Sequence, residues 1–256
     1  MQQRVDYDRI AHLYDEPLRD HAVDASLLCF LDERQDLTAS RLAILDVGCG
    51  TGKQLTADYN HLPTAWLIAG IDLSHAMLLQ GQKRCLSVAW VQGEGARLPF
   101  RAGSFDYVTS QFSYHHVRDR RGMVARIFQI LKPGGRFVMT NLDPWSMPAW
   151  FVYTFFPAAW ARDRHDFFPV DEFTAILAGA GFSNLQVQRQ HQREQVTLVS
   201  TLAYAIDRFR TSQLIAIDDD AYRLGIAAIR KDIETWGAQA SVNSELCLVT
   251  VSGDKW

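Results

Sequence analysis

The chain has 256 residues, of which 48% are hydrophobic and 21% charged, and its formal net charge is −3. This composition is typical of a folded globular protein and argues against disordered, collagen-like and disulfide-rich chains. The acidic balance supplies no basic surface to neutralise phosphates, so we do not expect a nucleic-acid partner. At roughly 150 residues per domain, the length suggests one large domain or one domain with a cap.

The four cysteines, Cys29, Cys49, Cys85 and Cys247, form no C-x-x-C pair, so the sequence predicts neither a metal site nor a disulfide framework. The opening residues MQQRVDYDRIAHLYDE are polar and contain no apolar run of the kind found in signal peptides. The longest uncharged run, residues 144–161, contains three prolines and is shorter than the roughly 20 apolar residues of a membrane helix. We therefore expect a cytoplasmic protein without an integral membrane span.

The first half of the chain alternates helical and strand patterns. Apolar residues at three-and-four spacing predict a helix over residues 5–31. A second helical pattern, with Met123 and Ile127 on its apolar face, ends at Pro133 and Gly134. Short apolar runs predict five strands, over residues 42–47, 66–71, 87–92, 105–112 and 135–142.

The second half continues with a helix at 170–182, a strand at 185–190, two helices within about 197–237 and a last strand at 245–251. Strands that alternate with helices predict a Rossmann-like, doubly wound α/β fold, a mostly parallel seven-stranded sheet with helices on both faces. We expect a single domain over residues 1–256. Its expected parts are an N-terminal helical lid (1–36), a core (37–142), an aromatic cap (143–170) and a C-terminal half (171–256) with the helical insert.

A glycine-rich turn, DVGCGTG, follows the first predicted strand and precedes a helix, an arrangement that lets backbone approach a ligand closely. The dinucleotide pattern G-x-G-x-x-G, aligned on Gly48 and Gly50, requires glycine where the sequence has Lys53. The phosphate-binding loop, aligned on Gly52, requires a hydroxyl residue where the sequence has Gln54. Neither motif is present.

The remaining pattern is D-x-G-x-G-x-G, followed by Asp72 at the end of the next strand, about twenty residues on, where a carboxylate can accept hydrogen bonds from a ribose diol. Together with GEGARLPFRAGSFDYV and LKPGGRFV, these motifs resemble the class I S-adenosylmethionine-dependent methyltransferases. The likeness is greatest to the small-molecule branch that includes the ubiquinone and menaquinone biosynthesis type. It covers residues 5–142 well, and only the overall plan of the chain matches beyond them.

The resemblance implies methyl transfer from S-adenosylmethionine, which leaves S-adenosylhomocysteine, and it implies positions for the cofactor-binding residues. The glycine turn would face the methionine part, Asp72 the ribose, and an acidic residue before LPF the adenine amino group. Aromatic residues near the N-terminus would close a lid. The residues so implied are Tyr7, Tyr14, Asp46, Gly48, Cys49, Gly50, Gly52, Asp72, Leu73, Met77, Glu94, Gly95, Gln111 and Phe112. Glu94-Gly95 stands where the family more often has Asp-Ala, which changes the geometry expected at the adenine.

Two adjacent histidines, His115 and His116, follow the fourth predicted strand, the place from which a side chain can reach an acceptor proton. With an ordinary pKa near 6.5, a histidine there can act as a general base. The alternative is that one of them caps or packs the following turn. Cys49 stands where the turn needs a small side chain, so we do not expect it to act as a nucleophile.

An excess of aromatic residues follows the fifth predicted strand. It can line a pocket for a flat or greasy substrate, form a dimer interface, or contact a membrane surface. Its place at the carboxyl edge of the sheet favours the pocket, and hence a small apolar or aromatic acceptor. The nine aromatic residues are Trp145, Trp150, Phe151, Tyr153, Phe155, Phe156, Trp160, Phe167 and Phe168.

Two other functions stay open at this point. One is a nicotinamide-dependent reductase on a similar sheet, against which Lys53 argues because it replaces the third glycine. The other is a non-catalytic protein that keeps the cofactor pocket and binds a partner. The sequence does not identify the atom that is methylated, or whether the chain forms a homodimer.

Overall fold

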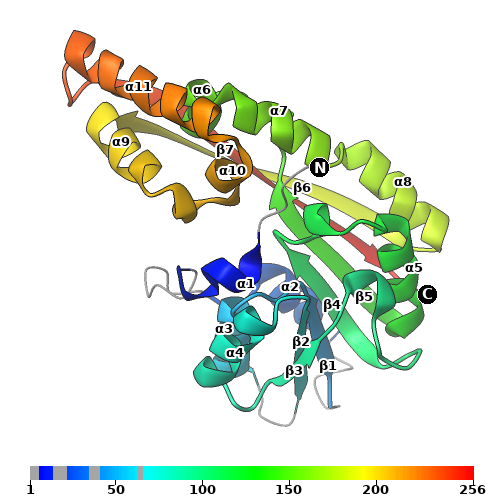
Figure 1. Ribbon diagram of the computed structural model, residues 1–256. Coiled ribbons are helices and arrows are strands. Elements are labelled where there is room, and N and C mark those ends of the chain that lie inside the picture. The colour runs from blue at the N-terminus through cyan, green and yellow to red at the C-terminus, as the bar shows by residue number, and fades with distance from the viewer. Residues whose placement is uncertain (1–5, 14–21, 35–40, 63–65) are drawn as a thin grey trace. The chain divides into compact units, whose positions relative to one another are not determined.

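The computed structural model describes residues 6–13, 22–34, 41–62 and 66–256 (Figure 1). The strands are β1 (Ala43–Val47), β2 (Leu67–Asp72), β3 (Ala89–Gln92), β4 (Phe105–Gln111), β5 (Leu131–Leu142), β6 (Ser183–Thr197) and β7 (Ser241–Asp254). The α-helices are α1 (Tyr7–Ile10), α2 (Ala25–Glu33), α3 (Lys53–His61), α4 (His75–Arg84), α5 (Arg120–Ile130), α6 (Phe151–Phe155), α7 (Pro157–Asp166), α8 (Val170–Ala180), α9 (Leu198–Ile206), α10 (Ser212–Ala216) and α11 (Asp219–Trp236). The 3₁₀ turns include η1 (Ala11–Leu13), η3 (Gly95–Arg97), η4 (Tyr114–His116) and η5 (Arg208–Arg210).

The strands form one seven-stranded sheet in the order β3-β2-β1-β4-β5-β7-β6. Strand β1 is parallel to both β2 and β4, as are β3 to β2 and β5 to β4. Strand β7 runs antiparallel to β5, because Gly134 N bonds to Lys255 O while Asp143 N bonds to Cys247 O. The mostly parallel Rossmann-like sheet predicted from the sequence is therefore confirmed.

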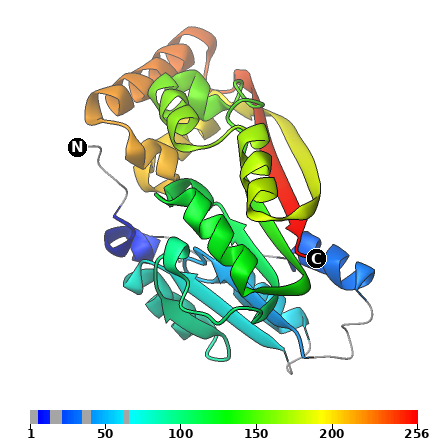
Figure 2. The same ribbon diagram turned by 90° about the vertical axis from the view of Figure 1, so that its right-hand side faces the viewer.

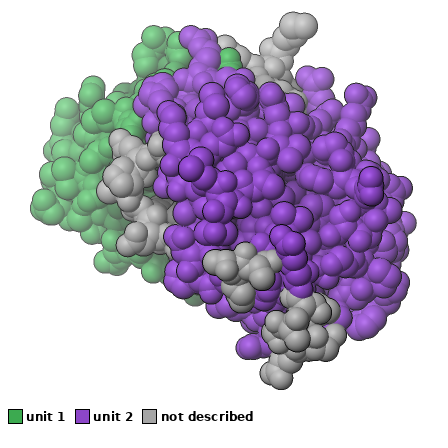
Figure 3. Space-filling view, turned by 90° about the horizontal axis from the view of Figure 1, so that it is seen from below, with its two compact units in different colours: residues 1–6, 142–169, 189–249 green, residues 7–141, 170–188, 250–256 purple. Residues whose placement is uncertain are grey.

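Contacts divide the chain into two compact units, shown in different colours in Figure 3. The described residues of unit 1 are Asp6, 142–169 and 189–249, and those of unit 2 are 7–141, 170–188 and 250–256, without the gaps given above. Almost all of the predicted cap and all of the predicted helical insert belong to unit 1.

Unit 2 has helices on both faces of its strands, as Figures 1 and 2 show. The alternation of strand side chains explains why. In β5, Val138 lies in a buried cluster with Leu27 and Phe30 of α2, whereas the neighbouring Phe137 makes a ring contact with Phe173 of α8. Both faces of the sheet are thus closed by apolar packing.

The prediction of one helix over residues 5–31 is wrong. Helix α1 ends at Ile10, residues 22–24 are not helical, and α2 begins only at Ala25. Asp24 is the N-cap of α2, because its Oδ1 accepts a hydrogen bond from Ser26 N at 2.9 Å. An aspartate in this role starts a helix and does not continue one.

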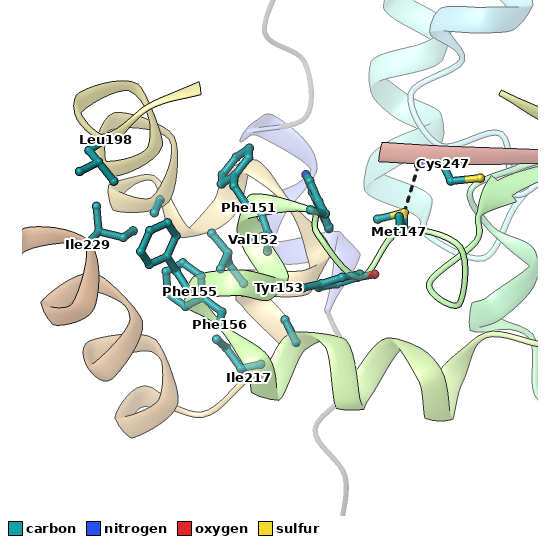
Figure 4. Close-up of a cluster of buried hydrophobic side chains, with 14 residues drawn as sticks. Met147, Phe151, Val152, Tyr153, Phe155, Phe156, Leu198, Ile217, Ile229 and Cys247 are labelled. Atoms are coloured by element: carbon teal, nitrogen blue, oxygen red, sulfur yellow. Dashed lines mark hydrogen bonds between the residues drawn. The ribbon is translucent and has the colours of Figure 1, made fainter. Parts of the chain in front are cut away.

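Unit 1 has an aromatic core of its own (Figure 4). Phe156 is 1% exposed, stacks on Tyr222 of α11, and lies so close to Gly225 that a Cβ there would come within 2.2 Å of its ring. Most of the aromatic residues noted in the sequence are buried, namely Trp150, Phe151, Tyr153, Phe155, Phe156 and Phe167. Packing within unit 1 therefore accounts for most of the aromatic excess.

Among the helices that the structure describes, none combines the length and the apolar character needed to cross a bilayer.

Candidate active site

The glycine turn between β1 and α3 is built from left-handed residues. Gly48, Gly50 and Gly52 have φ values of 79°, 53° and 66°. Gly48 N donates to Ile71 O at 2.7 Å, and Gly52 is the N-cap of α3. A Cβ on Gly48 would lie 2.3 Å from the Cβ of Ser113, so this position requires glycine for space as well as for conformation.

Asp72 ends β2 beside this turn, and its carboxylate is fixed by two backbone donors. Oδ2 accepts from Gly50 N and Oδ1 from Ser74 N, each at 2.8 Å. Burial raises the pKa of Asp72, which these hydrogen bonds oppose. Farther along, Leu73 is 67% exposed, whereas Met77 is buried in α4. Asp72, Leu73 and Met77 thus lie at the end of β2 or shortly after it, and β2 is the neighbour of β1, which leads into the glycine turn.

Asp46, the first residue of the glycine motif, is buried and only partly satisfied. Its Oδ1 has no hydrogen-bond partner among the described residues. Burial and the nearby carboxyl groups of Asp58, Asp24 and Asp72 raise its pKa well above the usual range. A buried carboxyl oxygen without a partner is unfavourable unless a ligand completes it. The ammonium group in the methionine part of S-adenosylmethionine fits this requirement, because it can donate to that oxygen.

Two further carboxylates near Asp46, those of Asp24 and Asp58, belong to no motif in the sequence. Asp24 Oδ2 accepts from Tyr107 OH at 3.1 Å and from Gln111 Nε2 at 3.4 Å. Asp58 Oδ1 accepts from Asp24 N and from Gln54 Nε2, both at 2.9 Å, and burial raises the pKa of Asp58 to about 6. An N-cap pattern before α2 was the one available signal for Asp24, and Asp58 offered none. Gln111 is the last residue of β4, and its amide is bonded to this cluster through Asp24.

Helix α1 is bonded to two loops at the carboxyl edge of the sheet. Tyr7 OH lies 2.7 Å from His116 Nε2 in η4, after β4. Asp8 Oδ1 accepts from Ser74 Oγ at 2.6 Å and from Ala76 N at 3.1 Å, after β2. Since β1 lies between β2 and β4, α1 is tied on both sides of the strand that leads into the glycine turn. Tyr14, the second predicted lid residue, lies outside the described residues.

The two histidines differ in environment although their rings are only 3.9 Å apart. The Nδ1 atom of His115 lies 3.1 Å from Asn141 Nδ2, and burial lowers the pKa of His115 well below 6.5. His116 is exposed and contacts Tyr7. His116 combines access to solvent with a hydroxyl partner.

The other predicted residues have simpler surroundings. Glu94 is exposed and lies 3.9 Å from Arg97, and a Cβ on Gly95 would lie 3.2 Å from Val47. Burial raises the pKa of Cys49 well above the usual range, which disfavours the thiolate and hence a nucleophilic role. Phe112 directly follows β4 and has a left-handed backbone, φ 52°, and a side chain that is 46% exposed.

The sheet order, the glycine turn and the acidic end of β2 define an α/β enzyme that binds a nucleoside-containing cofactor at its carboxyl edge. A family model described as a methyltransferase domain matches residues 45–139. Demethylmenaquinone methyltransferase from Staphylococcus aureus is 30% identical over 166 residues, which are 56% of this chain and 69% of that protein. The chain belongs to the class I S-adenosylmethionine-dependent methyltransferases, in the branch that includes menaquinone-biosynthesis enzymes.

Solved structures share the fold at low sequence identity. The YcgJ protein from Bacillus subtilis superimposes with a TM-score of 0.59 at 18% identity, over 89% of this chain and 98% of that one. Phosphoethanolamine N-methyltransferase 2 from Haemonchus contortus, in complex with phosphomonomethylethanolamine and S-adenosylhomocysteine, gives 0.57 at 18% identity over 97% of this chain and 58% of that one. S-adenosylmethionine is the methyl donor of the family, which argues against the nicotinamide-dependent reductase. The methyltransferase domain and the methyltransferase relatives favour an enzyme over a non-catalytic protein.

Proposed function

We propose that this enzyme transfers the methyl group to a small apolar or aromatic acceptor that loses a proton, and that Tyr7 and His116 receive that proton. The observation that carries the proposal is the 2.7 Å contact between Tyr7 OH of α1 and His116 Nε2 of η4, the turn that follows β4. A hydroxyl paired with an imidazole is suited to general-base catalysis. An acceptor without a dissociable proton has no need of such a pair.

The cofactor-binding residues in this proposal follow the order of the resemblance. The glycine turn and Asp46 hold the methionine part, whose ammonium group can donate a hydrogen bond to the unpartnered carboxyl oxygen of Asp46. Asp72 holds the ribose hydroxyls, with Leu73 and Met77 beside the adenine and Glu94 and Gly95 at its edge. Gln111 and Phe112 lie next to the sulfur, and Tyr7 and Tyr14 belong to the lid.

When bound, S-adenosylmethionine supplies an electrophilic methyl group on a positively charged sulfur. The chain then has to align the acceptor, exclude water and accept a proton. Alignment alone can supply on the order of 7 to 11 kcal/mol of barrier reduction. The acceptor proton passes to the Tyr7 oxygen as the Tyr7 hydroxyl proton passes to His116 Nε2.

His115 supports this role without taking part in it. Because burial holds its pKa well below 6.5, its ring is neutral near pH 7. A neutral neighbour 3.9 Å away does not oppose the positive charge that His116 acquires. In this proposal His115 is a positioning residue and His116 is the base.

Two observations support an apolar acceptor. Phe112, which follows β4 and belongs next to the sulfur in this proposal, has an apolar side chain that is 46% exposed. Exposed apolar side chains at the carboxyl edge of an α/β sheet are typical of a binding crevice for a compound of similar character. The Staphylococcus aureus relative carries the name of a quinone substrate, which agrees with a flat, largely apolar ring.

The test is a methyl-transfer screen with isotope-labelled S-adenosylmethionine against matched phenols, reduced quinones, amines and thiols. We expect transfer to the phenols or reduced quinones. Replacing the base, as in His116→Gln, should lower the rate by roughly 10²- to 10⁴-fold, and Tyr7→Phe should lower it as well. Affinity for S-adenosylhomocysteine, measured by calorimetry, separates loss of chemistry from loss of the cofactor site.

The matched control is His61→Gln at the end of α3, whose Nδ1 lies 2.8 Å from Ala57 O in the same helix. This variant should retain the wild-type rate. Transfer to amines or thiols alone, with Tyr7→Phe and His116→Gln as active as wild type, would falsify the proposal.

A further inference from the structure

We propose that Phe112 selects aromatic acceptors and that Ser113 is the positioning residue that holds it in a strained conformation for this purpose. The inference rests on the proposed function and narrows it to one acceptor-facing side chain. Its evidence lies entirely in the turn after β4.

The backbone of Phe112 is in a region that a bulky residue rarely occupies. Within the described residues, only Phe112 and Asn184 combine a side chain with a positive φ, at 52° and 51°. Asparagine tolerates the left-handed region, whereas an aromatic residue there is a genuine outlier. Such outliers persist where surrounding contacts enforce them, and they concentrate at functional sites.

Hydrogen bonds to the two neighbouring strands enforce the conformation of Phe112. Phe112 N donates to Thr140 O of β5 at 2.9 Å, which fixes the residue to one neighbouring strand. Ser113 Oγ donates to Val47 O of β1 at 2.8 Å, which fixes the following residue to the other. The Oγ atoms of Ser110 and Ser113 are also 2.8 Å apart. The chain is thus anchored on both sides of Phe112.

The same contact connects Phe112 to the glycine turn. Ser113 occupies the space that a side chain on Gly48 would need, since the Cβ would meet Ser113 Cβ at 2.3 Å. The left-handed bend at Phe112 is what brings Ser113 back over Gly48. The turn that carries Phe112 and the turn predicted to hold the cofactor are therefore fastened together.

Packing does not account for the phenyl ring. It is 46% exposed, so the strain is not offset by full burial of an aromatic side chain. Asparagine or glycine would satisfy this backbone conformation with less strain. An exposed, apolar ring held in a costly conformation beside a cofactor turn is explained by a ligand that contacts it. Aromatic rings prefer offset-stacked or edge-to-face partners, so the expected ligand is a planar ring.

The experiment compares Phe112→Asn, Phe112→Leu and Ser113→Ala with wild type in three measurements. These are urea unfolding, affinity for S-adenosylhomocysteine, and the ratio of kcat/KM for an aromatic acceptor to that for an aliphatic acceptor of equal reactivity. Phe112→Asn should raise the urea midpoint because it relieves strain, and should lower the ratio by about three- to tenfold. Phe112→Leu, which keeps an apolar side chain but not the ring, should give an intermediate ratio.

Ser113→Ala should lower the ratio mainly through KM of the aromatic acceptor, because the ring is present but no longer held. A double variant that combines Phe112→Asn with Ser113→Ala should lose no more selectivity than Phe112→Asn alone, since both changes act on one contact. The matched control is Phe209→Asn. Phe209 is 47% exposed in η5 and has an ordinary φ, so this variant should neither raise the midpoint nor lower the ratio.

The outcomes separate this inference from the proposed function. If wild type prefers aromatic acceptors and Phe112→Asn keeps that preference, the inference fails and the proposed function stands. A lower urea midpoint in Phe112→Asn with an unchanged ratio makes Phe112 a structural residue only. If wild type methylates apolar aliphatic acceptors but no aromatic one, the inference fails and the proposed function stands. If it methylates neither kind of acceptor, both fail.

Discussion

Two phenylalanines show the difference between the two units. Phe156 is 1% exposed in the core of unit 1, where its ring stacks on Tyr222 and fills the space beside Gly225. Phe112 is 46% exposed in unit 2 and has a left-handed backbone. The first residue is explained completely by what it packs against, and the second is not.

The difference extends to the polar groups. In unit 1, Asp163 is buried and its Oδ2 accepts from Tyr153 OH at 2.6 Å. In unit 2, Asp46 is equally buried, yet its Oδ1 has no partner among the described residues. The sequence drew attention to both regions, to unit 2 through its glycine turn and to unit 1 through its excess of aromatic residues. What distinguishes a site from a core is that the site leaves strained or unpartnered groups for a ligand.

The largest expected effect tests the aromatic core. Phe156→Ala should lower the free energy of unfolding by roughly 3 to 5 kcal/mol, because it leaves a cavity between α6 and α11. Urea denaturation measures the loss. The comparison residue is Trp236, also aromatic but 72% exposed, for which Trp236→Ala should change stability by less than about 0.5 kcal/mol. Similar losses in both variants would mean that the aromatic excess is not explained by packing.

The next effect tests the glycine turn. Gly48→Ala and Gly50→Ala both place a Cβ on a left-handed residue, but only the Cβ on Gly48 collides, with Ser113 at 2.3 Å, whereas that on Gly50 meets nothing. We expect Gly50→Ala to lose about 1 to 2 kcal/mol and Gly48→Ala roughly 2 to 4 kcal/mol. Equal losses by urea denaturation would show that Ser113 does not hold the turn as described.

Much of this architecture could be predicted from local sequence. Apolar runs marked β1 and β4 to within one residue, and the helix expected at 170–182 is α8, which ends two residues earlier, just before Gly181 with φ 104°. The pattern failed between α1 and α2, because the three-and-four spacing of apolar residues continues past Asp24, which ends up as the N-cap of α2. In the site, glycines and Asp72 stood out since their chemistry requires a fixed spacing. The roles of Asp24, Asp58 and Ser113 could not be read, because each depends on a neighbour far away in sequence.

The third prediction concerns pH. Burial raises the pKa of Asp58 in unit 2 and of Asp163 in unit 1 to about 6, from the usual 3.8. The folded protein therefore binds these protons more tightly than the unfolded chain, so each group lowers stability above pH 6. This penalty disappears as the pH falls from 6 towards 4. Asp58→Asn and Asp163→Asn should each raise stability at pH 8 by on the order of 1 to 3 kcal/mol, and neither should do so near pH 4.

A ligand distinguishes these two variants. S-adenosylhomocysteine at saturating concentration should change the gain in stability that Asp58→Asn gives at pH 8, since Asp58 belongs to the carboxyl cluster around Asp46. The gain from Asp163→Asn should stay the same, because its partners Tyr153 and Gln213 belong to the core of unit 1. Urea unfolding at several pH values gives the gain in stability of each variant with the ligand and without it. An equal response of both variants to the ligand would contradict the distinction between site and core.

The smallest effect concerns the cysteines. Cys29 is exposed, whereas Cys49, Cys85 and Cys247 are buried, and burial raises the pKa of Cys49 and of Cys247. A thiol reagent at pH 8 should therefore modify Cys29 in the folded protein and all four cysteines in urea. Although Cys49 lies inside the glycine turn, its side chain packs against Gly70 of β2, and Cys49→Ala should change methyl transfer by no more than about twofold. Rapid modification of Cys49, or a large loss of rate in Cys49→Ala, would instead mean that this thiol takes a direct part in the reaction. Cys49 would then belong with Asp46 and Phe112, whose surroundings in the protein do not fully account for them.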